Sequence, residues 1–474
     1  MDDEQVGPRR AQPCAQVDRR LALKSLSGNA DDEYLGLGIT DTIITRVSRI
    51  HQLTVRPTSA VLKYGDRDTD ALTAARELHA DAVIDGTVQR VGDRLRLNLN
   101  LFRVEDGQSL WSESFNISFN DMFTVQDQVS HRVAERLQLK LIPQEVKARP
   151  SSPEAFDDYL RGKYYLYRGG RSGNDTAIEM LERAVTKDPN FAQAYAALAQ
   201  AYRVRFFSFA PHEKQWQEKA FVAVEKALAL DPELADAYVA RATLLWTRAN
   251  NFPHEQSARE CQRALALNPN LDEAHRQLTV IYNHVGLLDK AIEESKKAFD
   301  PSSSALGGGA LLYQGNYQQA LNSGKELSTP FNHYQKAFAL THLGRRDEAS
   351  AIIEDSLKKF PEDQGGALYS MRAMLFALAG DERRAGENIN TALEQGKDFG
   401  HFHHATYTIA AAYAIMNKRE QALKWVQFTA DNGFPCYPLF EHDPDLNNLR
   451  QDPRFVAFMS RLKAQWEEYK TTFA

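Results

Sequence analysis

Cysteine is scarce in this chain: three residues among 474, Cys14, Cys261 and Cys436, lie far apart in the sequence. Their number and spacing exclude a disulfide framework and a cysteine-rich zinc knuckle, and they fit a reducing compartment. Long hydrophobic runs are absent too, since no apolar stretch approaches the ~18 residues that a membrane span needs. The N-terminal segment has no apolar core typical of a signal peptide. We therefore expect a cytoplasmic protein, or a periplasm-facing one if a membrane span precedes this chain.

An excess of positive charge is also lacking. The formal net charge is -6 and no basic domain or stripe stands out, which argues against nucleic acid as a direct partner. Catalytic signatures are missing: there is no G-x-S-x-G elbow, Walker loop, kinase motif set or zincin motif. No lysine and hydroxyl pair follows the glycines Gly307, Gly308 and Gly309, so they do not form a phosphate loop. The sequence predicts a protein that is not an enzyme and carries no cofactor.

Histidines cluster at one place, the segment HFHH with His401, His403 and His404. His401 and His404 fit one helix face, but a metal site needs a third or fourth converging ligand, which the sequence does not reveal. The pattern favours solvent-exposed histidines at the start of the last repeat, and no metal. The segment EHDPD at residues 441–445 lacks the glycine and the spacing of a calcium loop and indicates a helix cap.

What the chain does contain is a repeat. Small residues seven positions apart, most often followed by a proline, return with a period of about 34 residues. The set comprises Ala177, Ala184 and Pro189; Ala220, Ala227 and Pro232; Ser257, Ala264 and Pro269; Ala291, Ala298 and Pro301; Ala349, Ser356 and Pro361; Ala385 and Ala392; Ala422 and Thr429. This is the signature of tetratricopeptide (TPR) repeats, which are antiparallel helix pairs stacked into an all-α solenoid, an α-α superhelix.

About eight such units fit residues 156–434, and residues 435–474 are expected to form C-terminal capping helices. The small residues let paired helices approach closely, and the proline ends the second helix. The segment RGGRSGND suggests an inserted loop in the first unit. The glycine-rich fifth unit suggests a flexible joint, because glycine weakens helices.

Residues 19–142 follow a different pattern, typical of a small α/β domain with one mixed sheet. Leu95, Leu97, Leu99 and Leu101 alternate as in a half-buried strand, and the turn pairs Gly92–Asp93 and Asp106–Gly107 predict a three-stranded antiparallel meander. Asp68 or Thr69 is placed to cap the helix that precedes the meander. We expect residues 1–18 to be disordered and residues 143–155 to be a flexible linker to an independently folded repeat region.

Three segments of this domain carry a resemblance: SLSGNADDEYLGLGITDTIITRVSRI, ADAVIDGTVQRVGDRLRLNLNLFRVEDGQSLWSESF and DMFTVQDQVSHRVAERL. In their order and turn positions they resemble the TolB amino-terminal-like domain. The resemblance implies a bacterial regulator, because this domain commonly precedes TPR repeats and follows an effector: a winged-helix domain, as in CadC-like regulators, a nucleotide cyclase or a kinase. The sequence lacks this effector, and Arg19 and Arg20 stand where the family has an apolar first strand.

These observations predict a non-catalytic protein–protein interaction scaffold, the sensor or regulatory part of a bacterial signalling or transcriptional regulator. The alternative is the regulatory region or remnant of a nucleotide cyclase or protein kinase whose catalytic domain lies elsewhere. A third possibility, an envelope protein, would require an upstream signal peptide. The reading frame upstream of the start codon would distinguish these alternatives.

The resemblance to TPR arrays implies that the first helix of each pair lines a concave groove that contacts a peptide or protein. By register, the ligand-facing positions are Gln193, Gln200, Arg203, Asp236, Trp246, Arg276, Asn283, Tyr334, His404 and Tyr407. Amide, guanidinium and aromatic groups of this kind suit a peptide ligand. The two arginines carry the strongest expectation, because a guanidinium is costly to bury unpaired; Trp246 can equally pack against neighbouring helices.

Overall fold

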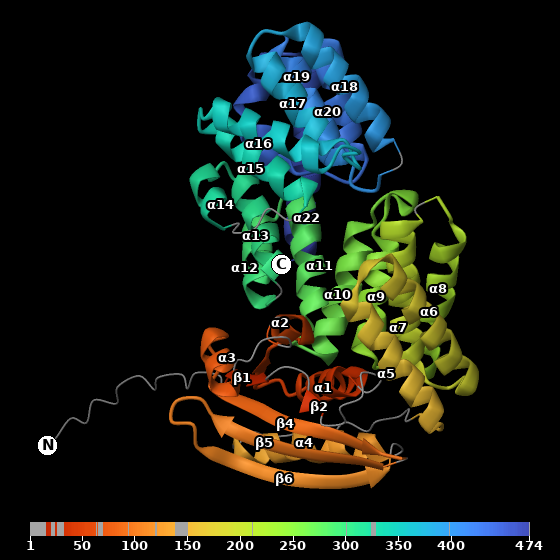
Figure 1. Cartoon of the computed structure of the whole chain (residues 1–474). Helices are drawn as coiled ribbons and strands as arrows, with labels where there is room; N and C mark the ends of the chain where they lie inside the picture. The colour runs from red at the N-terminus through yellow and green to blue at the C-terminus, as the bar shows by residue number, and fades with distance from the viewer. Residues whose placement is uncertain are drawn as a thin grey trace, which may run out of the picture. The chain divides into compact units, whose positions relative to one another are not determined.

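The computed structural model (Figure 1) describes residues 16–19, 24–25, 33–62, 64, 70–92, 94–118, 121–137, 150–210, 212–299, 301–323, 329–397 and 399–473. The chain divides into two compact units. The first comprises residues 1–198, 230–232 and 267–270, and the second residues 199–229, 233–266 and 271–474. Most of the segment expected to be disordered, most of the expected linker, and the expected caps Asp68 and Thr69 lie outside the described residues.

One mixed sheet organises the first unit. Its strands are β1 (Gln16–Arg19), β2 (Lys24–Ser25), β3 (Thr54–Val55), β4 (Ala82–Val91), β5 (Arg94–Arg103) and β6 (Ser109–Ser118). The predicted antiparallel meander is formed by β4, β5 and β6, while β1, β2 and β3 add parallel pairings in the order β3-β1-β4-β5-β6, with β2 also on β4. Strand β1 begins at Gln16, within the segment 1–18 that the sequence predicts to be disordered.

Alternation along β5 buries one face of the sheet. Leu95, Leu97, Leu99 and Leu101 are fully buried, as the pattern predicts. Helix α4 (Met122–Arg136) lies against the sheet (Figure 1). Two short helices, α2 (Thr58–Leu62) and α3 (Ala71–Glu77), complete the domain; α3 is capped by Asp70, whose carboxylate accepts a hydrogen bond from the Thr73 N–H.

Helix α1 (Glu33–Val47) is buried on nearly every side, and such a helix needs cover all round. Helix α5 (Pro153–Arg168) supplies part of it: Lys163 Nζ lies 3.2 Å from Asp41 Oδ2, and the Tyr167 hydroxyl donates to Asp41. Because α5 packs on α1, the division between the compact units falls inside α7 and not at the linker. The compact unit that contains the first domain therefore extends through the first helix pair, past the expected linker.

Helices α5 to α20 form eight consecutive pairs over residues 153–431, as far as the structure describes that range. Their bounds are α6 (Gly170–Lys187), α7 (Ala192–Val204), α8 (Gln215–Leu230), α9 (Ala235–Leu245), α10 (His254–Leu267), α11 (Asp272–His284), α12 (Leu288–Lys297), α13 (Pro301–Tyr313), α14 (Tyr317–Ser323), α15 (Pro330–His342), α16 (Arg346–Lys359), α17 (Ala367–Leu378), α18 (Glu382–Gly396), α19 (His403–Ile415) and α20 (Arg419–Asp431). Every small residue of the repeat signature is buried, so the α/β domain is followed by a TPR solenoid, as predicted.

Two details of the repeats differ from expectation. Helix α6 begins at Gly170, so most of RGGRSGND is helical and the chain breaks only at Gly169, whose φ is 66°. The glycines of the fifth unit lie inside α13, where a Cβ at Gly307 would come within 2.5 Å of Ser295 Oγ. Gly307 therefore permits close helix packing.

The C-terminal segment contains α21 (Tyr437–His442), the 3₁₀ helix η5 (Pro444–Leu449) and α22 (Pro453–Thr472). Arg454 pairs with Glu420 of the last repeat at 2.8 Å, while the Trp466 indole donates to the Gly286 carbonyl at 2.9 Å. Helix α22 thus reaches from the last pair back to the fourth. In the part of the chain that the structure describes, no helix has the length and apolar character of a membrane span.

Candidate partner-binding site

Half of the residues predicted to line an open groove are buried. Each of the following is between 1% and 5% exposed: Trp246, Asn283, Tyr334, His404 and Tyr407. The register correctly places all five on the side of their helices that faces other parts of the second unit. They are not exposed there, so the predicted exposure is wrong. In this structure these five side chains do not offer a surface to a partner.

The reason is that the repeats of the second unit close on one another. The Trp246 ring of the third pair lies 5.4 Å from the His401 ring that precedes the eighth, between ring centroids. The Tyr334 hydroxyl lies 2.9 Å from the Thr408 hydroxyl, and Tyr407 donates to Asp443 at 2.5 Å. Side chains of later repeats therefore fill the inner face of earlier ones.

The other five predicted residues, Gln193, Gln200, Arg203, Asp236 and Arg276, are half-buried. The two arginines converge on one carboxylate: Arg203 Nη2 lies 3.7 Å from Glu273 Oε1, and Arg276 Nη1 lies 3.2 Å from Glu273 Oε2. All three side chains keep 22–34% of their surface exposed. Two guanidinium groups thus lie around one carboxylate at a position that solvent reaches.

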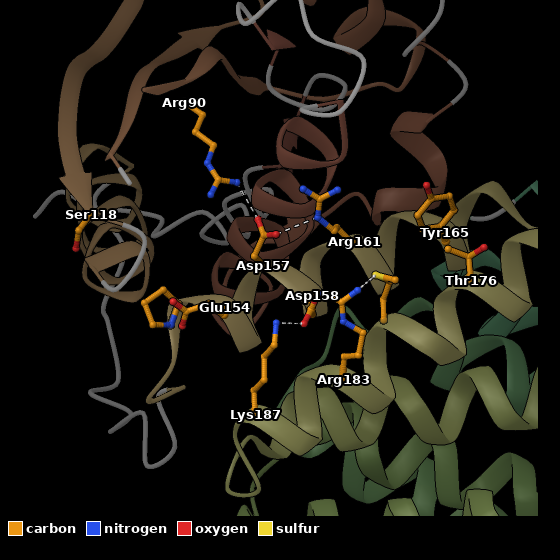
Figure 2. A pocket seen from close by; sticks show the side chains of 12 residues that line it. Arg90, Ser118, Glu154, Asp157, Asp158, Arg161, Tyr165, Thr176, Arg183 and Lys187 are labelled. Carbon is orange, nitrogen blue, oxygen red and sulfur yellow. Dashed lines mark hydrogen bonds and ion pairs between the residues drawn. The ribbon is translucent and has the colours of Figure 1, made fainter. Parts of the chain in front are cut away.

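A second polar site lies in the first unit, where α5 and α6 meet the ends of β4 and β6 (Figure 2). The hollow has a volume of about 730 Å³. Asp157 is bridged by Arg90 at 3.1 Å and by Arg161 at 2.9 Å. Figure 2 shows Lys187 pointing at Asp158, 2.6 Å away; the other partner of Asp158 is Arg183, at 3.0 Å.

The exposure of the charged side chains decides whether the hollow presents positive or negative charge to solvent. The four cationic side chains are 31–51% exposed, whereas the Asp157 side chain is 21% exposed and that of Asp158 only 3%. The anions thus form the floor and the cations the accessible rim, together with the exposed Glu154. Beside them, burial and the hydrogen bond to Asp157 raise the pKa of Tyr34. The hollow suits an acidic group better than a basic one.

The HFHH histidines are not solvent-exposed, which corrects the interpretation from sequence. His403 and His404 are buried and His401 is half-buried, and His284 of α11 joins them. Burial, reinforced by neighbouring histidines, lowers the pKa values of His284, His403 and His404, and burial lowers that of His401 to about 4. Sequence reasoning missed His284 because it lies far from HFHH in the chain. The sequence did offer one signal: His284 directly follows Asn283, which was predicted to face the groove.

The segment EHDPD does cap a helix, since the Asp443 carboxylate accepts from the Asp445 N–H at the start of η5. It also contacts His342 of α15, whose Nε2 lies 3.4 Å from Asp443 Oδ1 and 3.2 Å from Asp445 Oδ2. Burial alone would lower the pKa of His342, but the hydrogen bonds to both aspartates outweigh it and raise that pKa to about 10. We interpret this group as an ion pair that joins α15 to the C-terminal segment.

Comparison with known proteins relates parts of the chain to others. Residues 26–135 match the model of the family HilA/YgeH-like transcriptional regulator, second domain. The putative adenylate cyclase 3 of Rhizobium meliloti (strain 1021) is 31% identical over 183 residues, which cover 38% of this chain and 31% of that protein. The chain thus spans about a third of the length of that relative.

Solved structures with similar folds include PilF of Pseudomonas aeruginosa and human IFIT1, the latter a dimer with PPP-AAAA. PilF is 19% identical, with 44% of this chain and 92% of PilF covered and a TM-score of 0.34. IFIT1 is 15% identical, with 66% of this chain and 80% of IFIT1 covered and a TM-score of 0.41. Each of these similarities covers only part of this chain.

Proposed function

We propose that the chain is a non-catalytic interaction scaffold, the regulatory part of a bacterial signalling or transcriptional regulator, and that it binds an acidic peptide or protein segment. The first domain is then of the TolB amino-terminal-like kind. The matched transcriptional-regulator domain over residues 26–135 supports the regulatory role. The two described cysteines, Cys261 and Cys436, are free and buried, which supports a reducing compartment such as the cytoplasm.

The observation that carries the proposal is the arrangement of Arg203 and Arg276 around Glu273. Arginine is favoured for binding carboxylates because its planar guanidinium can donate two hydrogen bonds at once. Both guanidinium groups are partly exposed, so a partner carboxylate can reach them without displacing Glu273. The half-buried Gln200, on the same helix as Arg203, offers an amide for the partner's backbone.

The test uses the full chain and three fluorescent peptide pools of equal length: acidic, neutral and basic. We expect salt-sensitive binding of the acidic pool, and a loss of about tenfold or more in affinity in the double variant Arg203→Ala/Arg276→Ala. The matched control is Arg259→Ala/Arg383→Ala, which removes the same charge from side chains that are 64% and 74% exposed.

Equal affinity in both double variants would refute the assignment of these arginines. A collapse of the melting temperature in Arg203→Ala/Arg276→Ala alone would assign them to the fold and remove their support for the proposal. Preference for the basic pool would refute the predicted sign of the ligand.

A second candidate is the regulatory region of a nucleotide cyclase, favoured by the 183-residue similarity to the putative adenylate cyclase. The two candidates share the scaffold and differ in the effector it serves. Sequencing the transcript upstream of this chain would separate them, because a winged-helix coding region supports the first and a cyclase coding region supports the second. Cyclic nucleotide production by the complete native product would then test the second directly.

A further inference from the structure

Four histidines from distant parts of the second unit converge on one point. His284 is the last residue of α11, His403 and His404 are the first two residues of α19, and His401 lies in the turn before them. One ring nitrogen of each lies within 4.8 Å of the corresponding nitrogens of the others. Helical spacing alone could juxtapose two of these side chains, but it cannot place His284 among them.

Two of the rings are held in a defined tautomer by backbone carbonyls. His284 Nδ1 lies 2.7 Å from the Val280 carbonyl oxygen, and His403 Nδ1 lies 3.0 Å from that of Asn432. A carbonyl oxygen can only accept a hydrogen bond, so each Nδ1 carries the proton and each Nε2 presents a lone pair. Such a carbonyl contact is the usual second interaction of a metal-binding histidine.

The two lone pairs point at each other. His284 Nε2 lies 2.9 Å from His403 Nε2, and two acceptors at that distance repel unless a cation lies between or beside them. Two nitrogens bound to a tetrahedral zinc ion at about 2.05 Å each are separated by about 3.3 Å. A widening of about 0.4 Å, by small rotations of the rings, therefore converts the observed pair into two metal ligands.

The surroundings of the cluster are aromatic. The ring centroids of Trp246 and Phe434 lie 4.8 Å and 5.3 Å from that of His284, and the Tyr313 hydroxyl lies 3.3 Å from His404 Nδ1. When His404 Nδ1 donates to that hydroxyl, its Nε2 also presents a lone pair. No carboxylate belongs to the group among the residues that the structure describes. A shell of this kind excludes water from the ligand nitrogens.

We propose that the four histidines of this cluster bind one divalent transition-metal ion, with Zn²⁺ as the expected occupant. Neutral imidazole is a ligand for zinc, copper, nickel and iron. A site with four protein ligands and no open position is typical of a structural role. The ion would tie the end of α11 to the start of α19. It would therefore stabilise the contact between the fourth and eighth helix pairs.

The competing explanation is a histidine cluster that packs as core, with one proton shared between His284 and His403. In the first explanation a metal ion relieves the repulsion between the two Nε2 atoms, and in the second a proton does. A metal titration therefore separates them. The protein must be prepared without a polyhistidine tag, because a tag would bind the same ions.

The experiment strips the untagged full chain with a chelator, dialyses it against Zn²⁺ and measures bound metal by mass spectrometry. We expect about one zinc ion per chain. We also expect a melting temperature that rises with Zn²⁺, and d–d absorption of tetrahedral nitrogen coordination when Co²⁺ replaces zinc. His284→Gln and His403→Gln should abolish all three signals. His333→Gln is the matched control, because His333 is another buried histidine, bonded to Ser356 outside the cluster.

His401→Gln keeps the experiment decisive if the buried variants fail to fold, since His401 is half-buried. We expect this variant to fold and to lose about tenfold or more in metal affinity. Wild-type protein that binds no zinc, or a His401→Gln variant with unchanged affinity and an unchanged Co²⁺ spectrum, would overturn the four-histidine site. Copper or nickel in place of zinc in the untagged chain as first purified, measured by mass spectrometry, would overturn zinc as its occupant; a competition titration would not decide this, because Cu²⁺ binds most nitrogen sites more tightly than Zn²⁺ does.

Discussion

Replacing Asp443 by asparagine tests whether one buried carboxylate holds the C-terminal segment against two repeats. Asp443 is 2% exposed. Its Oδ2 accepts from the Tyr407 hydroxyl at 2.5 Å, while Oδ1 accepts from the Asp445 N–H at 2.8 Å and lies 3.4 Å from His342 Nε2. Helices α15 and α19 and the 3₁₀ helix η5 thus meet at one carboxylate, and asparagine keeps its shape while removing its charge.

Removing one partner of a buried ion pair costs about 3–5 kcal/mol. The pH dependence carries the same information. The pKa of His342 is about 10 in the folded chain, against about 6.5 in an unfolded one. Because the folded value is the higher, the stabilisation is complete below about pH 6.5 and is lost as the pH rises through about 10. Wild type should lose stability across that window, and Asp443→Asn should lose less.

Hydrogen exchange is the suitable assay, because a chain with two compact units need not unfold in one transition. At 1.4 kcal/mol per tenfold, the expected loss accelerates exchange in α19 and η5 roughly 100- to 4,000-fold. The control Asp381→Asn alters a half-buried cap of α18 and should act only there, by about 1 kcal/mol or less. Unchanged exchange in α19 and η5, or a wild type equally stable from about pH 6.5 to about pH 10, would refute the reasoning.

Two further predictions concern packing and the first unit. A Cβ at Gly396 would collide with the Phe402 ring, whereas nothing lies within 4 Å of one at Gly386 in the same helix. Gly396→Ala should therefore destabilise the folded chain by about 1–3 kcal/mol, and Gly386→Ala should stabilise it by up to about 1 kcal/mol. Thermal melts of the two variants would reveal or disprove this contrast. The Asn270 amide donates to the Ser48 and Leu53 carbonyls at 2.8 Å each and accepts from the Val55 N–H at 3.0 Å. Asn270→Ala should thus cost about 1–3 kcal/mol and speed exchange at residues 48–55, and unaltered exchange there would contradict the assignment.

Features determined by local pattern could be predicted from the sequence. The small residues of the repeat, such as Ala177 and Ala264, are buried because two helices can approach closely only where side chains are small. The meander followed from the alternation of Leu95 to Leu101 and from turn residues whose glycines take positive φ, 63° at Gly92 and 70° at Gly107. These signals lie within a few residues of the structure that they specify.

The closure of the second unit could not be predicted in this way. Each helix pair adds a small rotation to the solenoid, and the sum over several pairs decides whether Trp246 meets His401 or faces solvent. No local pattern encodes that sum. The same reasoning explains why HFHH was interpreted as exposed: His284, which contacts His403, comes from the fourth helix pair, and the Asn432 carbonyl comes from the end of α20.

The extent of the first compact unit depends on a different feature of the sequence. A polar, proline-bearing segment indicates a linker, but helix α5 begins at Pro153, inside the expected linker of residues 143–155. The sequence of α1, however, is apolar on more than one face, and this signal was available. Leu35 and Leu37 are two positions apart, which places them on nearly opposite faces of the helix, and both are buried. A second layer therefore had to cover the helix, and α5 provides it.

The closed interior also limits where a partner can bind. Trp246, Tyr334, Tyr407 and Phe434 lie between repeats and are at most 4% exposed. At about 1.5–3 kcal/mol for each large side chain, exposing all four would cost about 6–12 kcal/mol. A peptide with micromolar affinity has a binding free energy of about 8 kcal/mol. The cost of opening this interior is of the same size, so a peptide that had to open it would bind weakly or not at all. A partner is therefore expected on surfaces that are already accessible, of which the arginines around Glu273 and the rim of the α5–α6 hollow carry the charge.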